Sequence, residues 1–278
     1  MKLSLSVRIA EAFDNKERST IPFSDMVAMA VKYGFKAICM RASVAGIHSP
    51  IEVIRGLRAQ LDKAGLACSM VTGDFAVPQN NDFGPDGLRH IKPYLDLATE
   101  LRAPLIRVCI KKEQDLYWAQ KAADEAAERG IRLAHQSHTG SLFETPDNAL
   151  KTLAAIGRPN FGLIYEPANW FIAGQDYGPL SIERVRPYLF NVYVQNHLLN
   201  PKGVSPVITW GKGEVRVDHI GIWEKGGVDF DGVMTKLKEI RYSGFVTVHQ
   251  AFAGIMPTEE AVRRSGHYLS QFTGEAQK

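Results

Sequence analysis

The sequence predicts an α/β protein with a single (β/α)8 TIM barrel, because short apolar runs and helical segments alternate eight times along 278 residues. The apolar runs show no strict polar alternation, as expected for parallel strands that are covered on both faces. They lie at 3–9, 37–40, 67–71, 105–110, 131–134, 161–165, 192–194 and 245–248. The segments with helical spacing lie at 23–33, 50–64, 87–101, 113–128, 146–156, 181–188, 230–240 and 259–272.

Residues at the boundaries of these segments support the same alternation. Thr145 and Ser49 each precede a proline, in the order expected for a helix N-cap and its first helical residue. Glycine stands between helix and strand, where a left-handed helix end is expected, at Gly34, Gly65, Gly130, Gly157 and Gly244. The alternative is an open doubly wound sheet, but the segment SVRIAEAF lacks the GxGxxG phosphate turn of that fold.

Composition favours one domain over residues 1–278, because no linker or charge shift divides the chain. A net charge of +3 without a basic stripe argues against nucleic acid as a partner. The three cysteines are far apart and lie in predicted strands, which is typical of reduced thiols in a cytoplasmic protein. The first residues are interpreted as a strand and not as a signal peptide, and no apolar run approaches the roughly 20 residues that cross a membrane.

Two segments are longer than ordinary connections and follow predicted strands three and seven. They span residues 72–86 and 198–227. Loops beyond about 12–15 residues in a compact domain are usually lids or binding loops. The second contains Trp210 and is expected to cover a substrate or to form an oligomer contact, so a homo-oligomer remains open.

Polar side chains end four consecutive late strands. In a (β/α)8 barrel the C-terminal ends of all strands open onto one face, which carries the chemistry. We therefore expect these residues to form one site: Gln136, His138, Glu166, Asn169, Gln195, His197 and His249.

The late segments resemble the xylose-isomerase-like sugar isomerase and epimerase superfamily. The resemblance is sharpest from Ile131 to Phe252 and includes GVDFDGVMTKLKEIRYSGFVTVHQAF. It implies one divalent cation held by a Glu on strand five, an Asp or Glu on strand six, a His on strand seven and a Glu on strand eight. In such proteins the two Glu residues often serve as acid and base beside a sugar carbonyl.

This sequence departs from that pattern at three of the four positions. The four positions correspond to Gln136, Glu166, Gln195 and His249, and only Glu166 conforms to the pattern. A Gln amide has no proton that titrates near neutral pH, so Gln136 cannot be a general base. The two-glutamate mechanism is therefore not expected.

A metal at these four residues remains one hypothesis. One carboxylate, one imidazole and two amide oxygens suit Mn or Mg better than Zn, and the single negative charge predicts looser binding than in typical relatives. The alternative is that Gln136 and Gln195 hydrogen-bond each other or a water molecule.

Histidine is the predicted proton carrier. His138 and His249 would face a substrate from strands five and eight, with His197 as a third candidate, because a neutral imidazole acts as a base near neutral pH. The alternative for each is a buried structural histidine. His135 points to the opposite strand face.

Arginines lie within otherwise apolar strands, at Arg8, Arg41 and Arg107. A guanidinium inside a barrel needs a partner, which is either an acid such as Glu166 or, at Arg41 or Arg107, a substrate oxygen or carboxylate. Asn169 and Trp210 complete the predicted substrate-binding set.

These residues favour a cytoplasmic enzyme that acts on a small sugar or keto-sugar. The leading hypothesis is an isomerase or epimerase that removes a proton beside the carbonyl with histidine as acid and base. The alternatives are a lyase that performs β-elimination on a keto-sugar or keto-glycoside, and a non-catalytic sugar-binding barrel. A phosphodiester nuclease is disfavoured, because the strand ends carry too few acids.

Overall fold

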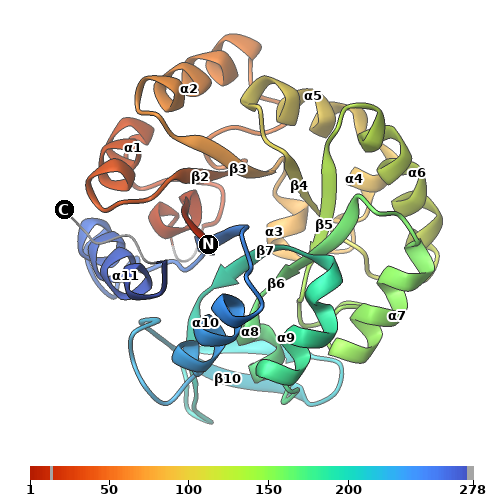
Figure 1. Cartoon of the computed structure of the whole chain (residues 1–278), viewed down its shortest axis with the longest axis vertical. Helices are drawn as coiled ribbons and strands as arrows, with labels where there is room; N and C mark the ends of the chain where they lie inside the picture. The colour runs from red at the N-terminus through yellow and green to blue at the C-terminus, as the bar shows by residue number, and fades with distance from the viewer. Residues whose placement is uncertain (13–14, 274–278) are drawn as a thin grey trace.

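A closed barrel of eight parallel strands forms the centre of the computed structural model, which describes residues 1–12 and 15–273 (Figure 1). The strand order is β1-β11-β7-β6-β5-β4-β3-β2, which confirms the predicted (β/α)8 barrel. The strands are β1 Lys2–Ser6, β2 Ala37–Arg41, β3 Ala67–Thr72, β4 Leu105–Val108, β5 Arg132–Gln136, β6 Phe161–Tyr165, β7 Leu189–Val194 and β11 Phe245–Val248.

Helices surround the barrel and pack on it through apolar faces (Figure 1). In α6, for example, Ala119, Ala122, Ala123 and Ala126 recur at helical spacing and are all buried. The longer helices are α1 Phe23–Lys32, α2 Ile51–Lys63, α5 Lys92–Leu101, α6 Asp115–Glu128, α7 Pro146–Ile156, α9 Pro179–Val185, α10 Phe230–Glu239 and α11 Thr258–Thr273. The short ones are α3 Ala76–Gln79, α4 Asp86–Arg89, α8 Pro167–Ile172 and the 3-10 turns η1 Val7–Ala10 and η2 Arg186–Tyr188.

Two predicted segments are divided in the structure. The first strand ends at Ser6 and continues as η1, whose start is capped by the Ser6 hydroxyl. The helix predicted at 87–101 is two helices, α4 and α5. Pro93 lies in the first turn of α5, where a proline starts a helix more readily than it continues one.

The boundary residues are confirmed in part. Thr145 caps α7 by accepting the amide of Asn148 at 3.1 Å, and Gly157 ends this helix at φ 58°. Ser49 is not the cap of α2, because Pro50 holds that position. After α10 the left-handed residue is Arg241, at φ 55°, and not Gly244.

The inside of the barrel is layered because side chains alternate along each strand. Six inward residues form a small apolar cluster: Cys39, Met70, Leu105, Ala134, Ile164 and Tyr193. The residues two positions further along face the same way, one layer nearer the C-terminal end. That next layer consists of Arg41, Thr72, Arg107, Gln136, Glu166 and Gln195. The cluster is therefore the floor beneath the predicted site.

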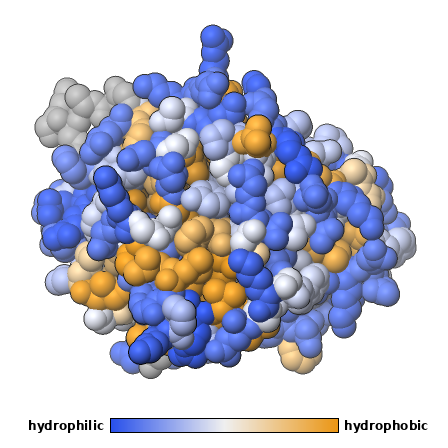
Figure 2. All heavy atoms as spheres, turned by 90° about the horizontal axis from the view of Figure 1, so that it is seen from below, coloured by the Kyte–Doolittle hydropathy of each residue, from blue (hydrophilic) through white to orange (hydrophobic). Residues whose placement is uncertain are grey.

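A second sheet stands outside the barrel, in the segment that the sequence marks as a long connection. Its strands β8 Asn196–Leu199, β9 Ser205–Thr209 and β10 Gly213–Ile220 are antiparallel, in the order β8-β10-β9. Figure 2 views the molecule from the side on which this sheet lies and shows an apolar patch on that face. The sheet and its loops expose Leu198, Leu199, Val204 and Ile208. The other long segment, 72–86, contains α3.

Within residues 1–12 and 15–273, no helix combines the length and apolar character needed to cross a bilayer.

Candidate functional site

The carboxylate of Glu166 is the centre of the site. Glu166 follows β6, is fully buried, and accepts hydrogen bonds from the side-chain amides of Gln136 and Gln195. The two amides come from the flanking strands β5 and β7, so the three residues converge at the C-terminal end of the barrel. The amides contact Glu166 and not each other.

Burial changes the acidity of this carboxyl group. Desolvation raises the pKa of Glu166 to about 8, although the positive charge of Arg107 and the two amides act in the opposite direction. Near neutral pH the group can therefore hold a proton or release it. This capacity distinguishes Glu166 from the two glutamines beside it.

Ser137 and Asn169 hold the main chain around Glu166. The Ser137 hydroxyl donates to the Glu166 carbonyl at 3.1 Å and accepts the Glu166 amide at 2.7 Å. The Asn169 side chain donates to the Ser137 carbonyl at 2.8 Å. These bonds join the ends of β5 and β6, so Asn169 has a positioning contact in addition to its predicted substrate-binding role.

His138 presents one free ring nitrogen. Its Nδ1 lies 2.7 Å from the Thr139 carbonyl, which can only accept, so Nδ1 carries the proton and Nε2 keeps its lone pair. Burial and the nearby Arg107 lower the pKa of His138 to about 3. The imidazole is neutral, which is the form a general base requires.

His249 follows β11 and lies against the barrel floor. Its ring stacks on Tyr193 with 3.8 Å between ring centroids, and Nδ1 is 3.0 Å from the Ser6 hydroxyl of β1. Burial, reinforced by the charges of Arg41 and Arg107, lowers the pKa of His249 well below its ordinary value. This histidine is also neutral.

His197 lies in the second sheet, because the chain leaves the barrel after Gln195 and enters β8. Its ring contacts His219 of β10, with 4.8 Å between centroids, and burial lowers its pKa to about 3. His135, on the outer strand face as predicted, stacks on Phe143 at 4.2 Å.

Arg41 has an acidic partner that the sequence interpretation did not identify. Its Nε and Nη2 donate to Glu11 at 2.6 and 3.0 Å, in an ion pair that is almost fully buried. Arg8 donates to the same carboxylate at 3.1 Å, and Ser43 donates at 2.8 Å. The one signal in the sequence is that Glu11 is the first acid after strand one.

Arg107 differs from Arg41, although both lie in the same layer of the barrel. It is 4% exposed, and it forms no ion pair or hydrogen bond with any described residue. Its closest described contact is with the ring of Tyr193, at 5.9 Å from the guanidinium carbon to the ring centroid. Its charge nevertheless acts on Glu166, His138 and His249.

Two lysines add positive charge near Arg107. Lys16 donates to the Pro78 carbonyl at 3.0 Å, and burial together with three arginines lowers its pKa to about 8. Lys111 donates to the Asn80 carbonyl at 2.5 Å. The carbonyl groups are neutral, so the contact of Lys16 leaves its charge uncompensated, whereas Lys111 also lies 4.0 Å from the carboxylate of Asp82.

Trp210 lies at the turn between β9 and β10 and is 56% exposed. This turn is tied to the loop after β5 by Glu144, another residue that sequence interpretation missed. The buried carboxylate of Glu144 accepts the backbone amides of Gly140, Trp210 and Gly211 at 2.6, 2.8 and 2.9 Å. The contact joins residues that are distant in sequence, so no local sequence pattern predicts it.

The predicted metal ligands do not form a cation site as they stand. Both predicted amide ligands turn nitrogen, and not oxygen, toward Glu166. No group of three His, Cys, Asp or Glu side chains suitable for a metal occurs in the described parts of the chain. As the two amides are oriented, they offer a cation no oxygen beside Glu166, and the metal at Glu166, His249, Gln136 and Gln195 stays a prediction.

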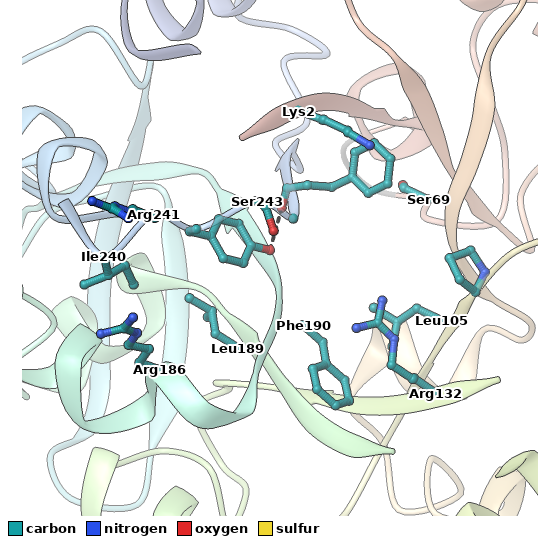
Figure 3. Close-up of a pocket in the computed structure, with 14 residues that line it drawn as sticks. Lys2, Ser69, Leu105, Arg132, Arg186, Leu189, Phe190, Ile240, Arg241 and Ser243 are labelled. Carbon is teal, nitrogen blue, oxygen red and sulfur yellow. Dashed lines mark hydrogen bonds between the residues drawn. The ribbon is translucent and has the colours of Figure 1, made fainter. Parts of the chain in front are cut away.

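The opposite end of the barrel has a hollow of about 480 Å³ (Figure 3). Lys2, Arg132 and Arg186 lie around it, and all three are exposed. Arg132 lies over the ring of Phe190 at 4.7 Å. None of the predicted site residues lines this hollow.

Solved structures with the same fold cover almost the whole chain. A probable 3-DHS dehydratase, AsbF, from Bacillus anthracis has a TM-score of 0.71 and 16% identity, over 97% of this chain and 99% of its own. A xylose isomerase-like TIM barrel protein from Mycobacterium smegmatis in complex with magnesium has a TM-score of 0.69 and 15% identity, over 98% and 96%. D-psicose 3-epimerase from Clostridium cellulolyticum with D-tagatose has a TM-score of 0.69 and 12% identity, over 99% and 98%. Identities this low show the fold alone.

Sequence comparison identifies the family. No curated protein matches the sequence. The family model described as xylose isomerase-like TIM barrel matches residues 27–271, which is most of the chain and includes every predicted site residue. The chain therefore belongs to the family of xylose isomerase-like TIM barrels.

Proposed function

We propose that this protein is an enzyme that removes a proton from the carbon beside the carbonyl of a sugar or keto-sugar, with His138 and His249 as base and acid. The proposal is supported by Glu166, whose buried carboxyl group can hold a proton, and by the neutral His138 and His249, since all three follow strands at the C-terminal end of the barrel. The fold neighbours include an epimerase with a bound sugar and a probable dehydratase, which supports chemistry of this kind.

The proposed step begins at the free Nε2 of His138 or at the ring of His249. The histidine takes the carbon-bound proton, and the electron pair of that bond moves into the carbonyl to form an enediolate. The same histidine, now an imidazolium, returns this proton to the neighbouring carbon to complete isomerisation, whereas epimerisation requires a proton from the opposite face, for which the protonated Glu166 is the proposed source. Departure of a leaving group from the β-carbon, with its electron pair, completes elimination.

Neighbouring side chains are assigned to the substrate oxygens. Glu166 and Arg107 hold these oxygens, and the buried Gln136 Oε1, which has no partner among described residues, accepts a sugar hydroxyl. Asn169, Trp210 and Arg41 remain proposed substrate-binding residues, and His197 a further acid or base. No step uses a divalent cation, because the two amides as oriented offer one no oxygen beside Glu166.

Exchange of the carbon-bound proton tests this function directly. Incubation with a keto-sugar in D2O should place deuterium beside the carbonyl, or release the proton during elimination. Replacing the true base by alanine should lower the rate by about 10² to 10⁴. His138→Gln or His249→Gln should not restore it, since an amide cannot accept the proton.

The dependence of activity on pH below 6.5 gives a second measurement. Because burial lowers the pKa of His138 to about 3, its ring stays neutral below the ordinary histidine value of 6.5. Activity should therefore persist below pH 6.5. Full activity in both single alanine variants would assign the proton transfer to Glu166 instead.

A non-catalytic sugar-binding barrel is the second candidate. It is favoured by neutral residues at three of the family's four ligand positions. Sugar binding with no deuterium exchange for any keto-sugar that binds would support this candidate against the enzyme.

A further inference from the structure

We propose that the substrate of this site carries an anionic group, a carboxylate or a phosphate, and that Arg107 binds it. The inference rests on the proposed function in one respect, namely that the anion belongs to the molecule on which the site acts. It concerns binding, so it can fail or succeed separately from the proton transfer.

The first argument is the balance of charge at this end of the barrel. The cations of the region are Arg8, Lys16, Arg41 and Arg107, and the carboxylates in contact with this layer are Glu11 and Glu166. Glu11 is shared by Arg8 and Arg41. Glu166 is occupied by the side-chain amides of Gln136 and Gln195. Positive charge is therefore in excess.

The second argument is the isolation of Arg107 within that charge. Burying a cation away from water costs on the order of several kcal/mol, even after the surrounding protein relaxes, unless a partner group compensates the charge. Arg41 recovers this cost through Glu11, but Arg107 has no anionic or hydrogen-bonding partner among the described residues and is similarly buried. Its Nε has no acceptor. A ligand that brings an anionic oxygen would provide one.

The third argument concerns the kind of ligand. A guanidinium presents planar donors that match the paired oxygens of a carboxylate or phosphate, and charge-assisted bonds of this type are about twice as strong as neutral ones. Neutral residues stand where the family pattern has two carboxylates and a histidine. The loss of those negative charges makes the site receptive to an anion and less so to a cation.

The position of Arg107 links the anion to the reacting atoms. Its guanidinium and the ring of His249 both lie against the ring of Tyr193, at 5.9 and 3.8 Å from the ring centroid, and Arg107 stands in the same barrel layer as Glu166. A negative group placed on Arg107 would bring the adjacent carbonyl carbon toward the histidines. It would also reduce the charge that disfavours protonation of these rings, and so strengthen them as bases.

Binding of matched probes tests the proposal. Calorimetry with D-glucuronate, D-glucose 6-phosphate and D-glucose compares a carboxylate, a phosphate and a neutral sugar on one ring. Wild-type protein should bind one anionic probe at least about tenfold more tightly than glucose, and the preferred probe identifies the anion. Failure of both anionic probes to bind at millimolar concentration, or equal binding of glucose, overturns the proposal.

Substitution of Arg107 then locates the effect. Arg107→Gln should weaken the anionic probe by about 10- to 100-fold and weaken glucose far less, because a neutral sugar loses a hydrogen bond but no charge pairing. Arg107→Lys keeps the charge without the planar fork and should show an intermediate loss, which provides a test should the glutamine variant fail to fold. The control is Arg132→Gln, an exposed arginine at the other end of the barrel, which should bind as wild type. Unchanged anion binding in both Arg107 variants overturns the assignment.

Deuterium exchange separates this result from the function itself. Anion binding that depends on Arg107, without exchange of any carbon-bound proton, would reject the proposed enzyme and keep the anion site. Exchange of a carbon-bound proton on a neutral sugar, with no preference for the anionic probes, would keep the proposed enzyme and reject the anion site.

Discussion

Arginines occupy both ends of the barrel, but in opposite environments. At the N-terminal end, Arg132 and Arg186 surround an open hollow and remain in water (Figure 3). At the C-terminal end, Arg41 and Arg107 are buried. A charge in water needs no partner, whereas a buried charge must be compensated by a group of the protein or of a ligand. Arg58 of α2 is also buried, but it donates to two carbonyls and to Asp62, so a buried arginine without a hydrogen-bonding partner among the described residues, which is Arg107, is what marks the proposed site.

The largest expected effect lies in the buried ion pair. Arg41→Gln leaves the fully buried Glu11 with Arg8 as its one remaining ion-pair partner among the described residues, so the free energy of unfolding should fall by about 3 kcal/mol or more. Chemical denaturation measures this change. Arg132→Gln is the control and should stay within about 0.5 kcal/mol of wild type. Similar losses in the two variants would show that burial does not separate the two ends.

The next prediction restores negative charge to the C-terminal end. Gln136→Glu combined with His249→Glu should tighten binding of Mn²⁺ or Mg²⁺ by at least about tenfold, because carboxylates replace neutral groups beside Glu166. Metal titration by calorimetry measures the affinity. Arg132→Glu, at the other end, provides a variant with added charge outside the site. No gain in affinity would mean that the three strand ends do not converge as described.

Sequence reasoning reached the layer of the site but not its partners. Alternation along the strands is a local property, and it correctly placed Gln136, Glu166 and Gln195 at adjoining strand ends. Glu11 and Glu144 were missed, because their contacts join segments that are distant in sequence. Local spacing does not encode such contacts.

The long segment after β7 shows a second limit. Its length led to its interpretation as a loop, although Val215, Arg216, Val217 and Asp218 alternate between apolar and polar, and the structure has the antiparallel strands β9 and β10 there. These strands are stabilised by pairing with each other and with β8, which the isolated pattern cannot reveal. The same dependence explains why His197 lies in this sheet and not in the barrel.

Acid should weaken the protein through its buried histidines. Burial lowers the pKa of His135 to about 3 from an unfolded value of 6.5, so the unfolded chain binds a proton that the folded protein rejects. The free energy of unfolding is therefore unaffected by His135 above pH 6.5, and it falls by about 1.4 kcal/mol per pH unit below that value. Denaturation curves at several pH values measure the slope. His135→Gln should reduce it, whereas Arg132→Gln should leave it unchanged.

The smallest expected effect concerns the turn that carries Trp210. Glu144→Gln keeps the size of the side chain but removes the charge that three backbone amides share, and one amide nitrogen replaces an acceptor oxygen. The loss should be about 1–2 kcal/mol, as for a charged hydrogen-bond acceptor, and should fall mainly on this turn. Hydrogen exchange should therefore speed up at Trp210 and Gly211 but not in β1 or β11. If Trp210 covers the substrate, the same variant should weaken sugar binding, and Glu183→Gln, a change at an exposed acid of α9, serves as the control. Unaltered exchange at Trp210 would show that the buried carboxylate does not hold the turn against the barrel.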